Sequence, residues 1–281
     1  MKRTLLVTGS SRGLGRALAE AALAAGHQVV ATARDAAAVR DLAEKYPDTA
    51  RAVSLDVTDP QAAEAAVRVA VEGFGRLDVL VNNAGYANIS AIEDTALDDF
   101  RAQMETNLWG AVHLTKAALP VLREQRAGHV VQVSSVSGRL APAVGLGAYV
   151  TAKFALEGFS EALAAEVAPF GVKVTIVEPG SMATTLASSM KLPRPSAPYA
   201  DAMAPMLQRY GDPAAAHGVS PQRAAEVLLG LLELAEPPLW FALSGAALDH
   251  IRKGEQRKIA ELDRWETLSR SADTPGGPSG S

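Results

Sequence analysis

Two side chains in the middle of the chain have the types and the spacing for proton transfer at neutral pH. Tyr149 and Lys153 are four residues apart, so on a helix they share one face and the ammonium can act on the phenol. A phenol with a pKa of about 10 is a poor base on its own, and an adjacent ammonium lowers that pKa. The pair therefore favours general acid–base chemistry.

Two polar segments that can meet this pair each follow a short apolar segment that is a candidate strand. Asn82-Asn83-Ala84-Gly85 ends the fourth strand candidate, and Ser134-Ser135-Val136-Ser137-Gly138 ends the fifth. If both strands are parallel in one sheet, their carboxyl ends open into the same crevice, where ligands of such sheets bind. Ser134, Ser135 and Ser137 are competing candidates for a serine that acts on the substrate.

A glycine turn near the start of the chain indicates a phosphate-binding site. Thr8-Gly9-Ser10-Ser11-Arg12-Gly13-Leu14-Gly15 follows the first apolar segment and directly precedes a helical pattern. Glycines permit a tight turn and a close backbone approach, and the free amides of a helix N-terminus attract a pyrophosphate. The order of strand, turn and helix predicts dinucleotide binding, with Gly9, Ser11, Arg12, Gly13, Leu14 and Gly15 at the cofactor.

The residues after the second strand candidate bear on the choice between NAD and NADP. An acidic residue is expected there in an NAD site, and this chain has Ala33 followed by Arg34. Arg12 and Arg34 can clamp a 2′-phosphate by charge-assisted hydrogen bonds, which favours NADP(H). In the alternative, both arginines are surface charges and Asp35 reaches the ribose of NAD.

Asp56 and Val57 follow the third strand candidate. Because ligands bind beyond the carboxyl ends of strands, Asp56 is assigned to the adenine amino group, with Val57 beside it.

Short apolar segments alternate with alanine-rich helical segments along the chain, which predicts an α/β fold with a doubly wound parallel sheet. Right-handed crossovers would make it a Rossmann-like three-layer α/β/α sandwich. The strand candidates are Thr4–Thr8, Gln28–Ala33, Ala52–Leu55, Leu77–Val81, His129–Ser134, Val172–Val177 and Leu239–Leu243. The helix candidates are Leu14–Ala25, Pro60–Glu72, Leu97–Arg123, Tyr149–Ala168, Pro221–Leu234 and Gly245–Leu268.

Residues 1–270 are expected to form a single NADP-binding and catalytic domain, with two departures from its regularity. Residues 182–219 are rich in Met and Pro and are interpreted as a substrate-covering lid, the alternative being an ordinary surface insertion. Residues 271–281 are rich in Pro, Gly and Ser and are expected to form a disordered tail. The helix candidate Gly245–Leu268 is expected to dock on the body through one apolar stripe.

Composition excludes several classes of function. The 281 residues carry a formal charge of −4 and no basic stripe, so a nucleic-acid partner is not expected. The chain has no cysteine, and its five histidines lack ligand spacing, so no metal is expected. The apolar segment from Val227 to Leu243 is interrupted by glutamates and prolines, so no membrane span is expected. A soluble, cytoplasmic protein is predicted.

Taken together, these motifs resemble the classical short-chain dehydrogenase/reductase family, and the likeness extends from Thr8 to Thr184. It is carried by the Thr-Gly-x3-Gly-x-Gly turn, the Asn-Asn-Ala-Gly run, Asn107, the serine before Tyr-x3-Lys, and Pro179-Gly180 followed by Thr184. The resemblance implies an NADP(H)-dependent oxidoreductase that moves a hydride between the nicotinamide and a carbonyl or alcohol.

The resemblance also implies a role for each matching residue. Tyr149 would be the general acid or base, and Lys153 would bind the nicotinamide ribose and lower the pKa of Tyr149. Ser135 would hydrogen-bond the substrate oxygen, and Asn107 would hold a water that relays protons towards Lys153. The remaining cofactor contacts implied are Asn83, Ala84, Gly85, Pro179, Gly180, Met182 and Thr184.

Other readings remain open at this point. The chain could be a catalytically silent NADP(H) sensor, an NAD-dependent alcohol dehydrogenase of the same family, or a sugar-nucleotide epimerase or dehydratase, although the last usually has a larger carboxyl-terminal domain. The apolar residues near the lid suggest a hydrophobic ketone, aldehyde or secondary alcohol as the small-molecule substrate. Relatives imply a homodimer or homotetramer.

Overall fold

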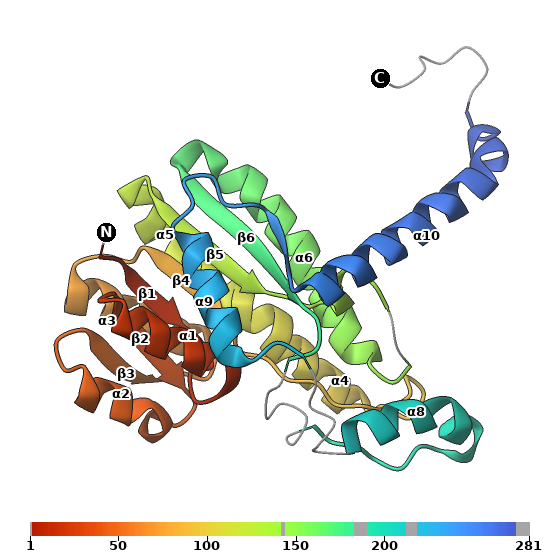
Figure 1. Cartoon of the computed structure of the whole chain (residues 1–281), viewed down its shortest axis with the longest axis horizontal. Coiled ribbons are helices and arrows are strands. Elements are labelled where there is room, and N and C mark those ends of the chain that lie inside the picture. The colour runs from red at the N-terminus through yellow and green to blue at the C-terminus, as the bar shows by residue number, and fades with distance from the viewer. Residues whose placement is uncertain (1, 142–143, 183–189, 212–217, 274–281) are drawn as a thin grey trace.

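The computed structural model describes residues 2–141, 144–182, 190–211 and 218–273. Within these ranges, seven parallel strands form one sheet in the order β3-β2-β1-β4-β5-β6-β7 (Figure 1). The strands are β1 (Thr4–Val7), β2 (Gln28–Ala33), β3 (Ala50–Ser54), β4 (Val79–Asn82), β5 (Gly128–Val133), β6 (Val172–Pro179) and β7 (Trp240–Leu243). The predicted doubly wound Rossmann-like sheet is confirmed, and most predicted ends differ from the observed ones by one or two residues.

The inner strands are largely apolar because both faces of the sheet are covered, whereas the edge strand β3 is only partly buried. In β1, Leu5 and Val7 point into one buried cluster and Leu6 points into the other, and all three are fully buried. Successive side chains of a strand point to opposite faces, so a continuous apolar run is needed to fill both layers.

Three helices cover each face of the sheet. The first layer contains α1 (Gly13–Ala24), α2 (Arg40–Lys45) and α9 (Pro221–Leu232), which contribute Leu18, Leu42 and Leu228 to the core. The second layer contains α3 (Pro60–Phe74), α5 (Gly110–Gln125) and α6 (Gly147–Val167). Figure 1 shows α1 and α9 side by side on the same face of the sheet.

The long helix predicted over Leu97–Arg123 is interrupted, which corrects that prediction. It consists of α4 (Leu97–Met104), a π-helical turn (Glu105–Trp109) and α5. Such single wide turns occur inside helices mostly at functional positions. The turn contains Asn107, one of the predicted site residues.

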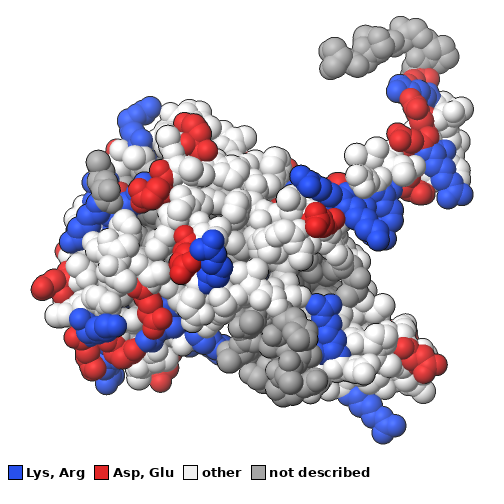
Figure 2. Space-filling model, viewed as in Figure 1, with Lys and Arg blue, Asp and Glu red and all other residues white. Residues whose placement is uncertain are grey.

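The expected docking of the C-terminal helix is wrong for most of its length. In α10 (Gly245–Arg270) only Ala247, Ile251 and Gly254 are buried, and every residue from 256 to 270 is exposed. Figure 1 shows the helix projecting from the body, which is why its apolar side chains meet nothing there. Positive and negative side chains alternate along this projection (Figure 2).

No helix in the described part of the chain is long and apolar enough to cross a membrane. The predicted tail falls mostly outside the described residues.

Candidate active site

A cavity of about 1070 Å³ lies beyond the carboxyl ends of the strands, where the order of the sheet reverses between β1 and β4. This is the position at which open α/β sheets bind ligands. The cavity brings together eighteen of the twenty predicted site residues. They are Gly9, Ser11, Arg12, Gly13, Leu14, Arg34, Asp56, Val57, Asn83, Ala84, Gly85, Asn107, Ser135, Tyr149, Lys153, Pro179, Gly180 and Met182.

The two remaining predicted residues are Thr184 and Gly15. Thr184 lies outside the described residues. Gly15 stands behind the glycine turn, where an added Cβ would lie 2.5 Å from the carbonyl oxygen of Gly9 and 2.4 Å from the amide nitrogen of Asn83. The absence of a side chain on Gly15 therefore permits close packing of α1 against the turn, and its assignment as a cofactor contact stays a prediction.

Thr8, which the sequence did not single out for a role of its own, fastens the glycine turn to β4. Its hydroxyl oxygen accepts hydrogen bonds from the backbone N–H groups of Asn83 and Ala84, each at 2.9 Å. The Asn83 amide returns a hydrogen bond of 2.8 Å to the Thr8 carbonyl oxygen. These bonds hold the turn and the Asn-Asn-Ala-Gly run as one wall of the cavity.

The N-terminus of α1 lies at the cavity, which Gly13 and Leu14 line. Arg12 is the N-cap residue and makes no side-chain cap, and the first turn of the helix has no acidic residue. The helix thus presents backbone donors and its positive dipole end to the cavity, as a pyrophosphate requires.

The edge of the cavity at β2 has the basic character that the sequence predicted. Arg12 and Arg34 both line it beside the buried Ala33. Asp35 is not among its lining residues, and its carboxylate instead caps the following 3-10 turn by accepting from the N–H of Ala37 at 2.9 Å. This geometry disfavours the alternative in which Asp35 serves the ribose of NAD.

Asp56 lies at the far end of the same edge. Its Oδ1 accepts hydrogen bonds from the backbone N–H and the hydroxyl of Thr58, at 3.0 and 2.8 Å. These bonds keep the pKa of the carboxyl below its ordinary value, so it is a carboxylate at neutral pH.

Tyr149 and Lys153 occupy successive turns of α6, and both face the cavity. The Lys153 Nζ lies 5.8 Å from the centre of the Tyr149 ring and donates a 2.8 Å hydrogen bond to the carbonyl oxygen of Val133. Burial raises the pKa of Tyr149 to about 12, against a lowering by its hydrogen bond with Ser135. Burial lowers the pKa of Lys153 to about 8.

The expected lowering of the Tyr149 pKa is therefore not found, because burial outweighs the effect of the hydrogen bond with Ser135. Removing the phenolate from water costs more than the neighbouring groups return. Tyr149 is therefore a protonated phenol at neutral pH, which is the form that a general acid needs.

The choice among the three serines favours Ser135. The hydroxyl of Ser134 is engaged by the buried Glu157, to whose carboxylate it donates a hydrogen bond of 2.7 Å. Ser137 is buried in the turn after β5, and its backbone N–H donates to the Ser135 Oγ at 3.1 Å. Ser135 alone of the three interacts with Tyr149.

Asn107 is buried in the π-helical turn and is tied to the loop after β4. Its Nδ2 donates to the carbonyl oxygens of Tyr86 and Gln103 at 2.8 and 2.9 Å, and its Oδ1 accepts from the N–H of Tyr86 at 3.2 Å. The Asn107 and Lys153 side chains both lie against Gly85. The predicted neighbourhood of Asn107 and Lys153 is therefore present.

Beyond Tyr149, apolar side chains line part of the cavity. Ile89, Leu146, Met203 and Met206 form a small core of their own, against which Tyr149 and Tyr210 pack. The described part of the predicted lid includes α8 (Ala200–Gly211), which supplies Met206, Arg209 and Tyr210 to the cavity. The Met-rich composition indicated this contribution, whereas no sequence signal indicated that His250 of α10 also lines the cavity.

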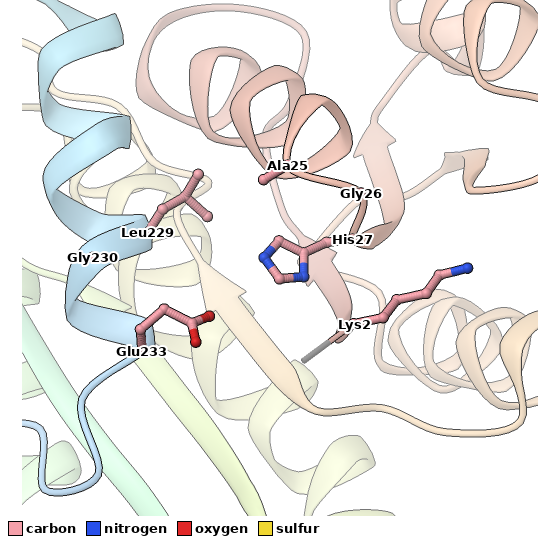
Figure 3. A pocket seen from close by; sticks show the side chains of 7 residues that line it. All are labelled: Lys2, Ala25, Gly26, His27, Leu229, Gly230 and Glu233. Carbon is pink, nitrogen blue, oxygen red and sulfur yellow. The ribbon is translucent and has the colours of Figure 1, made fainter.

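A second, smaller hollow of about 460 Å³ lies near the amino ends of β1 and β2 (Figure 3). It is lined by Lys2, Ala25, Gly26, His27, Leu229, Gly230 and Glu233. None of the predicted site residues is near it.

Comparison with known proteins agrees with this geometry. The family model described as short chain dehydrogenase matches residues 3–194. The chain belongs to the short-chain dehydrogenase family. Oxidoreductase BOA17 of Botryotinia fuckeliana is 44% identical over 271 residues, which is 96% of this chain and 98% of that protein. A 3-oxoacyl-[acyl-carrier-protein] reductase, FabG of Salmonella typhimurium, is 35% identical over 66% of this chain and 75% of its own.

A solved short-chain dehydrogenase from Streptomyces avermitilis is 40% identical, with a TM-score of 0.88 over 98% of this chain and 100% of that one. The Brucella melitensis 3-ketoacyl-(acyl-carrier-protein) reductase, solved with NADH, has a TM-score of 0.73 at 25% identity and covers 87% of this chain and 98% of its own. This chain is thus an oxidoreductase of the short-chain dehydrogenase family with the family's Rossmann-like fold.

Proposed function

We propose that this protein is an NADP(H)-dependent oxidoreductase that transfers a hydride between the nicotinamide and a carbonyl or secondary alcohol. The observation that carries the proposal is that one cavity joins a phosphate-binding turn flanked by Arg12 and Arg34 to the Tyr149, Lys153 and Ser135 set. The residues fit the cofactor, since a helix N-terminus with no side-chain cap lies at the cavity and Arg12 and Arg34 line the cavity near the end of β2.

When bound, the cofactor supplies or accepts the hydride. In the direction of reduction, Tyr149 donates its phenolic proton to the substrate oxygen, and the raised pKa ensures that the proton is present. Ser135 stabilises the negative charge that develops on that oxygen. Lys153, held by the Val133 carbonyl oxygen, binds the ribose and returns the proton to Tyr149 through the Asn107 side of the cavity. In the direction of oxidation, Tyr149 accepts the proton from the alcohol.

The substrate that suits the cavity is a hydrophobic ketone or aldehyde, or the corresponding alcohol. The wall beyond Tyr149 includes Leu146, Met190 and Met206, and methionine adapts to irregular apolar ligands. That FabG is by name a reductase of a carbonyl supports the direction of reduction.

The test is oxidation of the reduced cofactor across a panel of hydrophobic ketones and aldehydes, followed at the absorbance of the dihydronicotinamide. We expect turnover with several ketones and a higher kcat/KM with NADPH than with NADH. A kcat/KM in favour of NADH would contradict the cofactor assignment. Binding of NADPH without turnover of any carbonyl would favour a sensor over an enzyme.

A further inference from the structure

Two buried carboxyl groups lie behind Ser135 and Lys153, and the reaction proposed above does not use them. Glu157 is on α6 and only 5% exposed, and Glu178 is on β6 and only 1% exposed. Buried acids are rare unless they are paired or hydrogen-bonded, because removing a carboxylate from water is costly. Their position beside the active site therefore calls for a reason.

Glu157 is tied to the strand end that carries Ser135. Its Oε1 accepts the 2.7 Å hydrogen bond from the hydroxyl of Ser134, the residue just before Ser135. The turn after β5 closes over this bond, because a Cβ on Gly138 would lie only 2.2 Å from Oε1 and 2.3 Å from the Ser134 Oγ. The bond is thus enclosed and cannot be replaced by water without moving the turn.

Lys153 and Glu157 hold the same strand end from one face of α6. They are four residues apart, so their side chains are neighbours on the helix, and both are buried. Lys153 binds the carbonyl oxygen of Val133, and Glu157 binds the side chain of Ser134. The backbone leading into Ser135 is therefore held at two consecutive residues.

The charged groups near Glu157 have opposing effects on its ionisation. Glu178 and Glu161 disfavour its ionised form, Arg139 and the Ser134 hydrogen bond favour it, and its own negative charge favours the charged form of Lys153. Arg139 also lies 3.5 Å from Glu178 and 3.5 Å from Glu255 of α10, so it is shared among three acids. Burial raises the pKa of Glu157 to about 7, while the pKa of Lys153 is about 8. The negative charge of Glu157 therefore opposes the effect of burial on Lys153.

We propose that Glu157 is a positioning residue for the hydride-transfer reaction: through Ser134 it fixes Ser135, and through its charge it keeps the buried Lys153 protonated. This inference rests on the proposed function for its consequence in catalysis. The charge effect itself is a property of the protein and can be measured without a substrate.

The test separates the charge of Glu157 from its hydrogen bond. Glu157→Gln keeps the size of the side chain and an oxygen that can accept from Ser134, but it removes the charge. Glu157→Asp keeps the charge on a shorter side chain. Glu166→Gln is the matched control, because Glu166 is an exposed acid on the same helix that lies outside this cluster.

The measurement is the dissociation constant of NADPH between pH 6 and pH 10, by protein fluorescence, together with kcat/KM for any ketone that is turned over. The loss of NADPH affinity at alkaline pH that is absent in Lys153→Met is assigned to deprotonation of the Lys153 ammonium, and we call it the alkaline limb of the binding profile. We expect Glu157→Gln to move this limb to lower pH by at least about half a unit, because a nearby opposite charge no longer supports the ammonium. Glu157→Asp should return the limb towards its wild-type position, and Glu166→Gln should leave it in place.

Two results would overturn the inference. One is a Glu157→Gln profile that coincides with the wild-type profile while Glu157→Asp is impaired, which is the pattern of a purely structural hydrogen bond. The other is a wild-type profile with no limb that depends on Lys153. Failure of the proposed function has a different signature, namely no turnover of any carbonyl by the wild-type protein.

Discussion

At the scale of single residues, the central feature is that environment, rather than residue type, assigns the roles. Tyr149 is kept protonated by burial, and Lys153 is brought by burial to a pKa of about 8. The same serine run supplies one hydroxyl to the cavity and one to a buried carboxylate. Side chains that look equivalent in the sequence thus do different work.

The basic edge of the cavity gives a prediction about the cofactor. Arg34→Gln should raise the KM for NADPH at least about tenfold, because a charge-assisted hydrogen bond to a phosphate is worth about 1.5–3 kcal/mol. The KM for NADH, which has no 2′-phosphate, should change little. Steady-state kinetics with both cofactors measure this.

Arg40→Gln is the control for that prediction, since Arg40 is an exposed arginine that does not line the cavity. If Arg34→Gln raises the KM for NADPH and for NADH equally, Arg34 does not bind the 2′-phosphate.

At the scale of elements, nearly all strands of the sheet and most of the helices that cover it could be predicted from the sequence. Continuous apolar strands such as β1 could be predicted because both layers of the sheet must be filled, and β2 was predicted with its observed ends. Most of the site followed from the same reasoning, since residues after parallel strands converge. The π-helical turn was missed because its extra residue leaves the helical pattern of apolar positions almost unchanged.

The buried acids could not have been found from the sequence. Glu157 belongs to a helix with many exposed acids, and nothing in its neighbours along the chain distinguishes it from Glu161 or Glu166. Only the packing of β5 and β6 against α6 places its carboxyl in the interior. Likewise, the sequence motif does not show that Gly15 is also required for packing against Gly9 and Asn83.

The contact between β5 and β6 gives a prediction about acid stability. His129 is 6% exposed and its Nε2 lies 2.9 Å from the Thr175 Oγ1. Burial, together with the charges of Arg3 and Lys173, lowers its pKa from 6.5 to about 4. The unfolded chain therefore binds a proton more readily than the folded protein between these values, and stability falls as the pH drops through this window.

His129→Gln removes this proton binding. Between pH 7 and pH 5 the Tm of the wild-type protein should fall by about 3 °C or more beyond the fall in the variant. Thermal unfolding at the two pH values measures the difference. Parallel falls in the two proteins would mean that His129 is already charged in the folded state.

At the scale of the whole molecule, the body and the projecting part of α10 differ in how far their apolar side chains are buried. The body contains the sheet, the cavity and both helical layers, whereas Ile259, Leu262, Trp265 and Leu268 of α10 are all between 47% and 73% exposed. A homodimer or homotetramer, expected from the family resemblance, stays a prediction. The fold of the body should not depend on this projection.

A chain shortened to end at Lys258 tests that separation. Lys258 donates a hydrogen bond to the carbonyl oxygen of Arg139 and is the last residue of α10 for which we find a bond to the body. We expect the Tm of the shortened protein to stay within about 2 °C of that of the full chain, because removal of exposed side chains changes stability little. A much lower Tm would show that the projecting segment packs against something in solution.

The most direct test of the account is the turnover number of Tyr149→Phe with NADPH and a ketone that the wild-type protein reduces. The substitution removes one oxygen atom and the proton that the mechanism needs. We predict that kcat falls at least roughly a hundredfold while the protein stays folded and still binds NADPH, with Tyr46→Phe as the control outside the cavity. Turnover close to that of the wild-type protein would contradict the assignment of Tyr149 as the general acid.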